Sequence, residues 1–371
     1  MSLSIISMKK LATLLVDYSL GVQPEQRVLL QGEAGAEPLM MAVFNICLER
    51  GASPFIWQYP EGMTDSIFRY GKPEKFGEYL QELKRFVETY DHRVRILGES
   101  NTKELSGFDP DLVSKFYAEG GKISRIMLDR EMKGELHWVL TLFPTQAYAQ
   151  DAAMSLPDFE DFVYNACMPD QDDPVGYWKK VAARQDKVIQ WLKGKEHVHV
   201  TAPETDLTLS IKGRPFENCA CKVNVPDGEI FTSPIENSMN GHVYFSYPTL
   251  YEGFEVSGVR LWFENGKVVK ASAEKNEAFL MKKLNTDAGS RYLGEFAIGT
   301  NEGIQKFTGQ ILFDEKIGGS FHMALGHGYP ETLSQNESAI HWDMICDLRN
   351  GGRIVVDDEL LYENGKFVID F

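Results

Sequence analysis

The sequence of 371 residues lacks the features that mark several large classes of protein. No apolar run approaches the roughly 18 residues that a membrane span requires, and the best run, residues 39–48, is interrupted by Asn45. Basic residues are outnumbered, with 38 Lys and Arg against 54 Asp and Glu, which gives a formal net charge of −16. Because contacts to phosphate backbones need clustered basic side chains, this balance argues against a nucleic-acid-binding surface.

Cysteine is scarce, and the N-terminus shows no secretory pattern. The five cysteines form an odd, scattered set in a long chain, which is typical of reduced thiols rather than of a disulfide framework. No basic segment followed by a hydrophobic run and a cleavage site opens the sequence, so no signal peptide is predicted. We therefore expect a cytoplasmic protein whose partners are neither membranes nor nucleic acids.

Familiar nucleotide and hydrolase motifs are also missing. No G-x-x-x-x-G-K-[ST] phosphate loop occurs, and residues 32–37, GEAGAE, lack the dinucleotide glycine spacing and carry two glutamates that would repel a pyrophosphate. No G-x-S-x-G motif supports an esterase-like triad. Cys219 and Cys221 have no nearby Cys or His to complete a soft-metal site, so we interpret them as buried thiols.

The first half of the sequence has the pattern of an α/β domain. With 43% hydrophobic and 25% charged residues, the chain is globular rather than disordered. Residues 27–31, 37–50 and 54–57 read as strand, helix and strand, which predicts a βαβ unit and hence a parallel sheet. Further strands are predicted at residues 94–97, 123–128 and 138–143, and helices near 109–119, 158–167 and 175–193.

The pattern changes after the last of these helices. Residues 198–202 and 207–211 alternate around a turn, and Asn265-Gly266 and Asn364-Gly365 are strong hairpin signals because both residues of such a pair tolerate positive φ. We therefore predict two domains. They are an α/β N-terminal domain with a mostly parallel sheet, residues 1–190, and a β-rich α+β C-terminal domain, residues 191–371.

The residues that carry chemistry are concentrated in the second half. In residues 338–345, SAIHWDMI, the apolar neighbours predict a buried strand, so His341 and Asp343 share one face. A buried imidazole beside a buried carboxylate needs compensation, and a divalent cation provides it efficiently. Taken alone, however, the motif is more simply explained by a structural hydrogen-bonded pair.

Four further residues favour the metal interpretation. Glu229, Glu295, His322 and Tyr329 each lie in or beside an apolar segment of strand character. Together with the His341–Asp343 pair they supply two imidazoles, three carboxylates and a phenol. This mixed nitrogen and oxygen set, without sulfur, suits two adjacent divalent ions such as zinc, cobalt, manganese or magnesium. We therefore expect residues 191–371 to be the metal-binding catalytic domain.

These motifs resemble those of the thermophilic-type metallo-aminopeptidases, the family of aminopeptidase T and aminopeptidase S. The likeness covers nearly the whole chain, begins at residues 11–24, and is sharpest at residues 226–234, PDGEIFTSP, where the family places a metal-ligating Glu. One departure is a shorter stretch between Tyr329 and His341, a loop expected to shape substrate access. The resemblance implies six metal ligands: Glu229, Glu295, His322, Tyr329, His341 and Asp343.

The resemblance also implies an activity. We expect a homodimeric enzyme that hydrolyses the N-terminal residue from peptides with a free N-terminus, using a water activated by two divalent metal ions. Glu295 or Asp343 is the expected bridging carboxylate, and Glu295 and Tyr329 are expected to be catalytic. For the general base the sequence offers three acidic residues near the ligands, namely Glu302, Glu236 and Glu337, of which Glu302 is the first candidate.

Two other functions fit the same residues. A second kind of dinuclear hydrolase, acting on a different amide or ester, would keep the ligands and differ in its pocket. A non-catalytic binding protein on the same scaffold would show no hydrolysis with any divalent ion. Assays on a panel of aminoacyl and acyl substrates distinguish these alternatives from an aminopeptidase.

Overall fold

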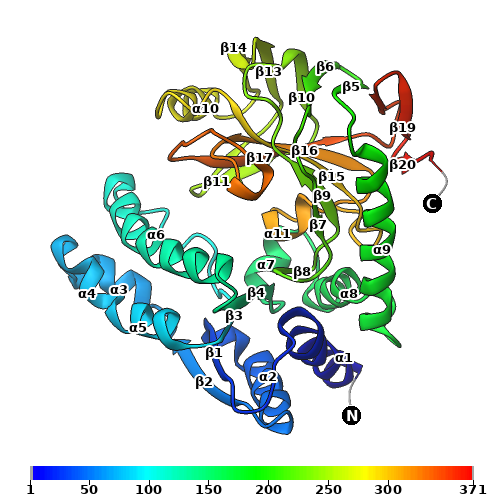
Figure 1. Cartoon of the computed structure of the whole chain (residues 1–371). Helices are drawn as coiled ribbons and strands as arrows, with labels where there is room; N and C mark the ends of the chain where they lie inside the picture. Colours follow the sequence, from blue (N-terminus) through cyan, green and yellow to red (C-terminus); the bar gives the residue numbers. More distant parts are fainter. Residues whose placement is uncertain (1–2, 370–371) are drawn as a thin grey trace. The chain divides into compact units, whose positions relative to one another are not determined.

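The computed structural model describes residues 3–369, which form two compact units (Figure 1). The first unit runs to residue 175 and includes residues 221–225, and the second comprises residues 176–220 and 226 onward. Helix α9 (Pro174–Leu192) therefore belongs almost wholly to the second unit. The units differ from the predicted halves in this helix and in the short segment 221–225.

The first unit is built on a parallel sheet with the strand order β2-β1-β3-β4-β8. Its strands are β1 (Arg27–Glu33), β2 (Ser53–Tyr59), β3 (His92–Leu97), β4 (His137–Leu142) and β8 (Asn224–Val225). Strands β1, β2 and β3 contain the strands predicted at residues 27–31, 54–57 and 94–97, and β4 covers all but the last residue of the strand predicted at residues 138–143. The predicted α/β architecture of this part of the chain is confirmed.

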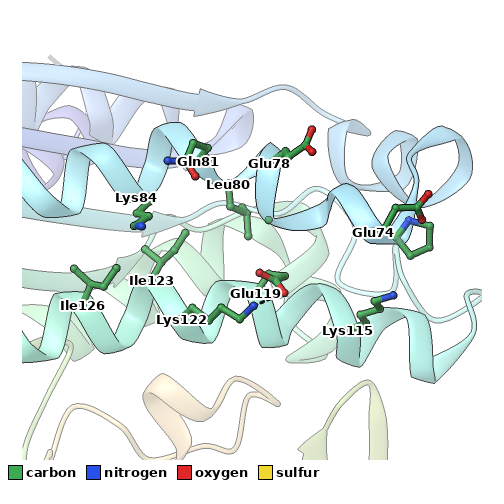
Figure 2. A pocket seen from close by; sticks show the side chains of 12 residues that line it. Glu74, Glu78, Leu80, Gln81, Lys84, Lys115, Glu119, Lys122, Ile123 and Ile126 are labelled. Carbon is green, nitrogen blue, oxygen red and sulfur yellow. Dashed lines mark hydrogen bonds and ion pairs between the residues drawn. The ribbon is translucent and has the colours of Figure 1, made fainter.

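Helices cover this sheet, and two of them, α5 and α6, bury one of its faces (Figure 1). The helices of the unit are α1 (Leu3–Thr13), α2 (Glu37–Glu49), α3 (Met63–Tyr70), α4 (Phe76–Tyr79), α5 (Gln81–Thr89), α6 (Pro110–Met132), α7 (Gln146–Asp151) and α8 (Leu156–Cys167). Leu83 and Val87 of α5 and Ile123 and Met127 of α6 pack with Leu29 of β1 in one apolar cluster. A groove of about 440 Å³, drawn in Figure 2, lies between α4 and α5 on one side and α6 on the other.

The predicted strand at residues 123–128 is wrong, because these residues lie inside helix α6. Ile123 and Met127, four residues apart, are only 8% and 5% exposed, whereas Leu128 is 47% exposed. The apolar residues thus follow the helical period of 3.6, not the strand period of 2. A short apolar run does not distinguish the two by itself, and here the helix that begins at Pro110 continues through it.

The second unit packs two antiparallel sheets around one core. The larger sheet contains β5 (His197–Ala202), β6 (Thr205–Ser210), β10 (Asn240–Phe245), β13 (Val259–Glu264), β14 (Lys267–Ser272), β18 (Arg353–Val356), β19 (Glu359–Glu363) and β20 (Lys366–Phe367). The predicted Asn-Gly turns join β13 to β14 and β19 to β20, and all four turn residues have positive φ. A two-stranded ribbon, β11 (Thr249–Tyr251) and β12 (Phe254–Val256), and helices α10 (Glu277–Leu284) and α11 (Ile311–Asp314) complete the unit.

The smaller sheet has the order β17-β16-β15-β9-β7. Its strands are β7 (Glu217–Cys219), β9 (Glu229–Thr232), β15 (Leu293–Gly299), β16 (Ser320–Gly326) and β17 (His341–Asp347). The β-rich C-terminal part predicted from the hairpin pattern is thereby confirmed. Within residues 3–369 we find no helix with the length and apolarity that crossing a bilayer requires.

Candidate metal centre

One face of the smaller sheet is apolar and the other carries charged side chains. Because side chains alternate along a strand, Phe296, Met323 and Trp342 point into the core of the unit. The residues between them point the other way, and antiparallel pairing brings them together from four neighbouring strands. This opposite face carries Glu229 on β9, Glu295 on β15, His322 on β16, and His341 and Asp343 on β17.

Four of these side chains converge around the fifth, the carboxylate of Glu295. Its Oε1 lies 3.2 Å from Nε2 of His322, and its Oε2 lies 3.5 Å from Nε2 of His341. Glu229 approaches the first histidine, with 3.4 Å between Oε2 and Nε2 of His322. Asp343 approaches the second, with 3.5 Å between Oδ2 and Nε2 of His341. Glu295 is thus shared by two groups of potential ligands, one on each side of it.

The histidine of β17 is oriented by the backbone. Nδ1 of His341 donates a hydrogen bond to the carbonyl oxygen of His327 at 2.8 Å. The proton is therefore on Nδ1, and the lone pair of Nε2 is free to face Glu295 and Asp343 when the ring is neutral. Such a fixed tautomer is typical of histidines that bind metal ions.

The carboxylates of the cluster stabilise positive charge on the two histidines. Burial alone would lower the pKa of His322, but the hydrogen bond to Glu295 and the charge of Glu229 raise it to about 9. Burial is likewise outweighed for His341, where Asp343 and Glu295 raise the pKa to about 10. For Asp343, burial is outweighed by the charge of His341, and the pKa falls to about 2.

Two carboxylate oxygens in the cluster lack a hydrogen-bond donor. Oε2 of Glu229 and Oδ1 of Asp343 are buried and have no hydrogen-bond partner among the described residues. Buried polar atoms are almost always satisfied, so such oxygens call for an explanation. A divalent cation bound by carboxylate and imidazole would supply it, so the residues present fit the metal ions that the sequence predicts.

Tyr329 lies beside the cluster, in the turn after β16. Its ring is inclined by 61° to that of His341, with the centroids 5.2 Å apart, and the centroid of the Phe231 ring lies 5.5 Å away. Burial, together with the charges of Glu295 and Asp343, holds the pKa of its phenol well above the ordinary value. All six residues that the sequence singled out as ligands are therefore at or next to one site.

The three acidic residues considered for the general base are elsewhere. Glu302 is 77% exposed and pairs with Arg184 at the surface, and Glu337 is exposed. Glu236 accepts hydrogen bonds from Arg214 and from the backbone N–H of Gln335. Although each lies near a ligand in sequence, the structure brings none of the three into the ligand groups.

Instead, the loop after α11 contributes two charged residues that the sequence patterns did not reveal. Glu315 has a carboxylate oxygen within 4.8 Å of ligand atoms of His322 and Asp343. Its neighbour Lys316 is buried and forms ion pairs with Glu315, Glu229 and Asp227. A further group of potential ligands, Cys219, Asp227 and Glu229, lies on this side of the cluster.

Comparison with known proteins shows the family to which the chain belongs. The sequence matches the model of the family described as thermophilic metalloprotease (M29) over residues 6–367. The chain belongs to the M29 family. This membership, together with the aminopeptidases to which the chain is similar, confirms the family and the enzyme class predicted from the sequence, that of the metallo-aminopeptidases, which are hydrolases.

The M29 chain is similar along most of its length to several aminopeptidases. It is 27% identical to aminopeptidase 2 of Geobacillus stearothermophilus over 359 residues, which cover 89% of this chain and 85% of the relative. It is 26% identical to aminopeptidase T of Thermus thermophilus, covering 97% of this chain and 95% of the relative. A solved structure of wild-type AmpT from Thermus thermophilus matches with a TM-score of 0.86 at 22% identity, covering 98% and 99% of the two chains.

Proposed function

We propose that this M29 chain removes N-terminal residues from peptides with the help of two divalent cations. The observation that carries the proposal is the position of Glu295, whose two oxygens face two different histidines at 3.2 and 3.5 Å. A carboxylate shared in this way is the arrangement expected of a ligand that bridges two ions. The aminopeptidase names of its relatives support the choice of substrate.

The ligand groups suggest how the ions would be divided. Glu229 and His322 would hold one ion and His341 and Asp343 the other, with Glu295 between them. Tyr329, whose ring packs against that of His341, would complete the set as a phenol oxygen. When bound, such a pair of cations polarises the scissile carbonyl and lowers the pKa of a water molecule. The identity of the metal stays open, since zinc, cobalt, manganese and magnesium all accept nitrogen and oxygen ligands.

We assign the general base to Glu315 in place of Glu302. Its carboxylate lies within 4.8 Å of ligand atoms of His322 and Asp343, so it is close to the cluster. Its side chain is 15% exposed and therefore accessible from solvent. The ion pair with Lys316 at 2.8 Å fixes its position. Glu315 would take the proton from the attacking water and deliver it to the nitrogen of the departing amine, which is the usual task of a carboxylate in such a site.

Three further properties belong to the proposal. The free α-amine of the peptide would bind at the carboxylate-rich cluster, which explains cleavage at the N-terminus. Each chain would consist of the two predicted domains, residues 1–190 and 191–371. Two such chains would form a homodimer, and the enzyme would be cytoplasmic. These properties follow from the family resemblance and from the acidic, cysteine-poor sequence.

Elemental analysis and aminopeptidase assays on the wild type and on His341→Ala test the proposal. We expect two bound divalent ions per wild-type chain and release of the first residue from short peptides with a free amine, but not from their N-acetylated forms. His341→Ala should lose at least one ion and most of the turnover. Pure protein without metal, together with unchanged turnover in the variant, would refute the proposal.

A further inference from the structure

Lys316 is held in the interior by its backbone. The carbonyl oxygen of Lys316 accepts a hydrogen bond from the N–H of Asn301 at 3.1 Å, and the N–H of Gly318 returns one to Asn301 at 3.0 Å. The loop also passes so close to the end of β15 that a Cβ on Gly299 would lie 2.3 Å from the carbonyl oxygen of Ile317. The position of residue 316 is therefore fixed by close backbone packing.

The side chain of Lys316 points into a set of carboxylates. It is 2% exposed, and its ammonium group lies 2.8 Å from Oε1 of Glu315 and 3.8 Å from Oδ1 of Asp227. It also donates a short hydrogen bond to Oε1 of Glu229. Lysine is almost never buried to this extent unless it is paired, so these carboxylates account for its presence.

Two of these carboxylates, Asp227 and Glu229, belong to a group that could bind a metal ion. The ligand atoms of Cys219, Asp227 and Glu229 all lie within 4.8 Å of one another. The ammonium of Lys316 contacts two of these three residues, so it takes the place that a cation would occupy there. It also occupies one oxygen of Glu229 and leaves the other, Oε2, facing His322 at 3.4 Å.

We propose that Lys316 is a built-in cation that fills a third cation position beside the metal centre and restricts Glu229 to one metal-facing oxygen. This inference rests on the proposed two-metal centre. Five carboxylates surround the site, namely Asp227, Glu229, Glu295, Glu315 and Asp343. Two divalent ions and one lysine balance their five negative charges. The centre is therefore neutral with two ions, and it does not bind a third.

Two substitutions at residue 316 separate charge from space. Lys316→Ala removes the charge and opens the position, and it should bind one more divalent ion than the wild type. Because Cys219 would ligate that ion, cobalt-loaded Lys316→Ala should show a thiolate charge-transfer band, and Lys316→Ala/Cys219→Ser should lose it. Lys316→Leu removes the charge but fills the position, so it should gain no ion and should bind metal about 10- to 100-fold more weakly, as expected when a group that orients a ligand is lost.

The control is Lys306→Ala, which changes an exposed lysine nearby in sequence and should match the wild type. An unchanged ion count without a thiolate band in Lys316→Ala, or unchanged metal affinity in Lys316→Leu, would overturn the inference. A wild-type chain that binds metal but releases no amino acid would refute the proposed function alone, since the ion count and the band do not depend on turnover.

A crystal structure of the wild type loaded with cadmium tests the inference without any variant. We expect the ammonium of Lys316 to remain on Oε1 of Glu229, with no anomalous peak at Cys219. A cadmium ion bound to Cys219 in the wild type, or a lysine turned away from Glu229, would overturn the inference even if both Lys316 variants failed to fold.

Discussion

Replacement of Glu295 by glutamine is the most informative single change, because Glu295 belongs to both ligand groups. The substitution keeps the shape of the side chain but removes its negative charge. It also turns one metal-facing oxygen into an NH₂ group, which cannot bind a cation. Since Oε1 faces His322 and Oε2 faces His341, the loss is felt on both sides.

The size of the effect follows from the number of ligands. Structural zinc sites with four ligands bind with about 10–16 kcal/mol, or about 2.5–4 kcal/mol for each ligand. A tenfold change in affinity corresponds to about 1.4 kcal/mol, so the loss of one full ligand weakens binding by roughly 60- to 700-fold. Because the amide keeps one oxygen, we expect a loss of about this size for one ion and a smaller loss, caused by the missing negative charge, for the other.

The assay is a titration of metal-free protein with zinc or cobalt, followed by elemental analysis and by the rate of amino-acid release. Glu302→Gln is the matched control, since it makes the same chemical change at a glutamate that is 77% exposed and outside the cluster. The control should keep two ions and wild-type turnover. If Glu295→Gln also kept both ions with affinities within threefold of the wild type, our assignment of the centre would be wrong.

Three other predictions concern Glu315, Arg214 and His92, and each follows from the surroundings of its side chain. Glu315→Gln should lower kcat by about 10²- to 10⁴-fold while both ions remain, as measured by initial rates and elemental analysis; loss of an ion would make Glu315 a ligand instead of the base. Arg214→Met should lower the free energy of unfolding by about 2 kcal/mol in urea denaturation, because the 6% exposed guanidinium donates to Glu236 and to the turn after Tyr329. The exposed pair Arg353–Glu363 offers the control, and Arg353→Met should cost less than about 1 kcal/mol; equal losses in the two variants would contradict the role given to Arg214. Burial and the neighbouring His137 lower the pKa of His92 from 6.5 to about 4, so the unfolded chain takes up a proton there before the folded chain does. Stability contributed by neutral His92 is therefore lost as the pH falls from about 6.5 to 4, on the order of 3 kcal/mol in total. His92→Leu should flatten this part of the stability–pH curve, and an equal slope in both proteins would contradict it.

The sequence predicted the β17 part of the centre because strand periodicity is a strong local rule. In residues 338–345 the apolar residues Trp342 and Met344 alternate with His341 and Asp343, and the structure buries the first pair in the core and brings the second pair together. Glu229, Glu295 and His322 come from other strands, and only the sheet order makes them neighbours. Composition marked them as unusual carboxylates and imidazoles in apolar segments, and the resemblance to a family supplied their roles.

The residues of the loop after α11 could not be predicted in this way. Glu315 and Lys316 lie in a run of charged residues that reads as an ordinary solvated turn, and no periodicity indicates which side chain points inward. The burial of Lys316 depends on Asn301 and on carboxylates that are distant in the sequence. For the same reason, the position of Glu302 near the ligands in sequence does not indicate where its side chain points. Its neighbour Asn301 is 2% exposed, whereas Glu302 itself turns outward.

The central claim is that Glu295 lies between two metal ions. The most direct test is anomalous diffraction from crystals of the protein loaded with manganese or zinc. We predict two peaks about 3.5–4 Å apart, one beside Glu229 and His322 and the other beside His341 and Asp343, with the Glu295 carboxylate between them. A single peak, or ions bound away from Glu295, would contradict the account.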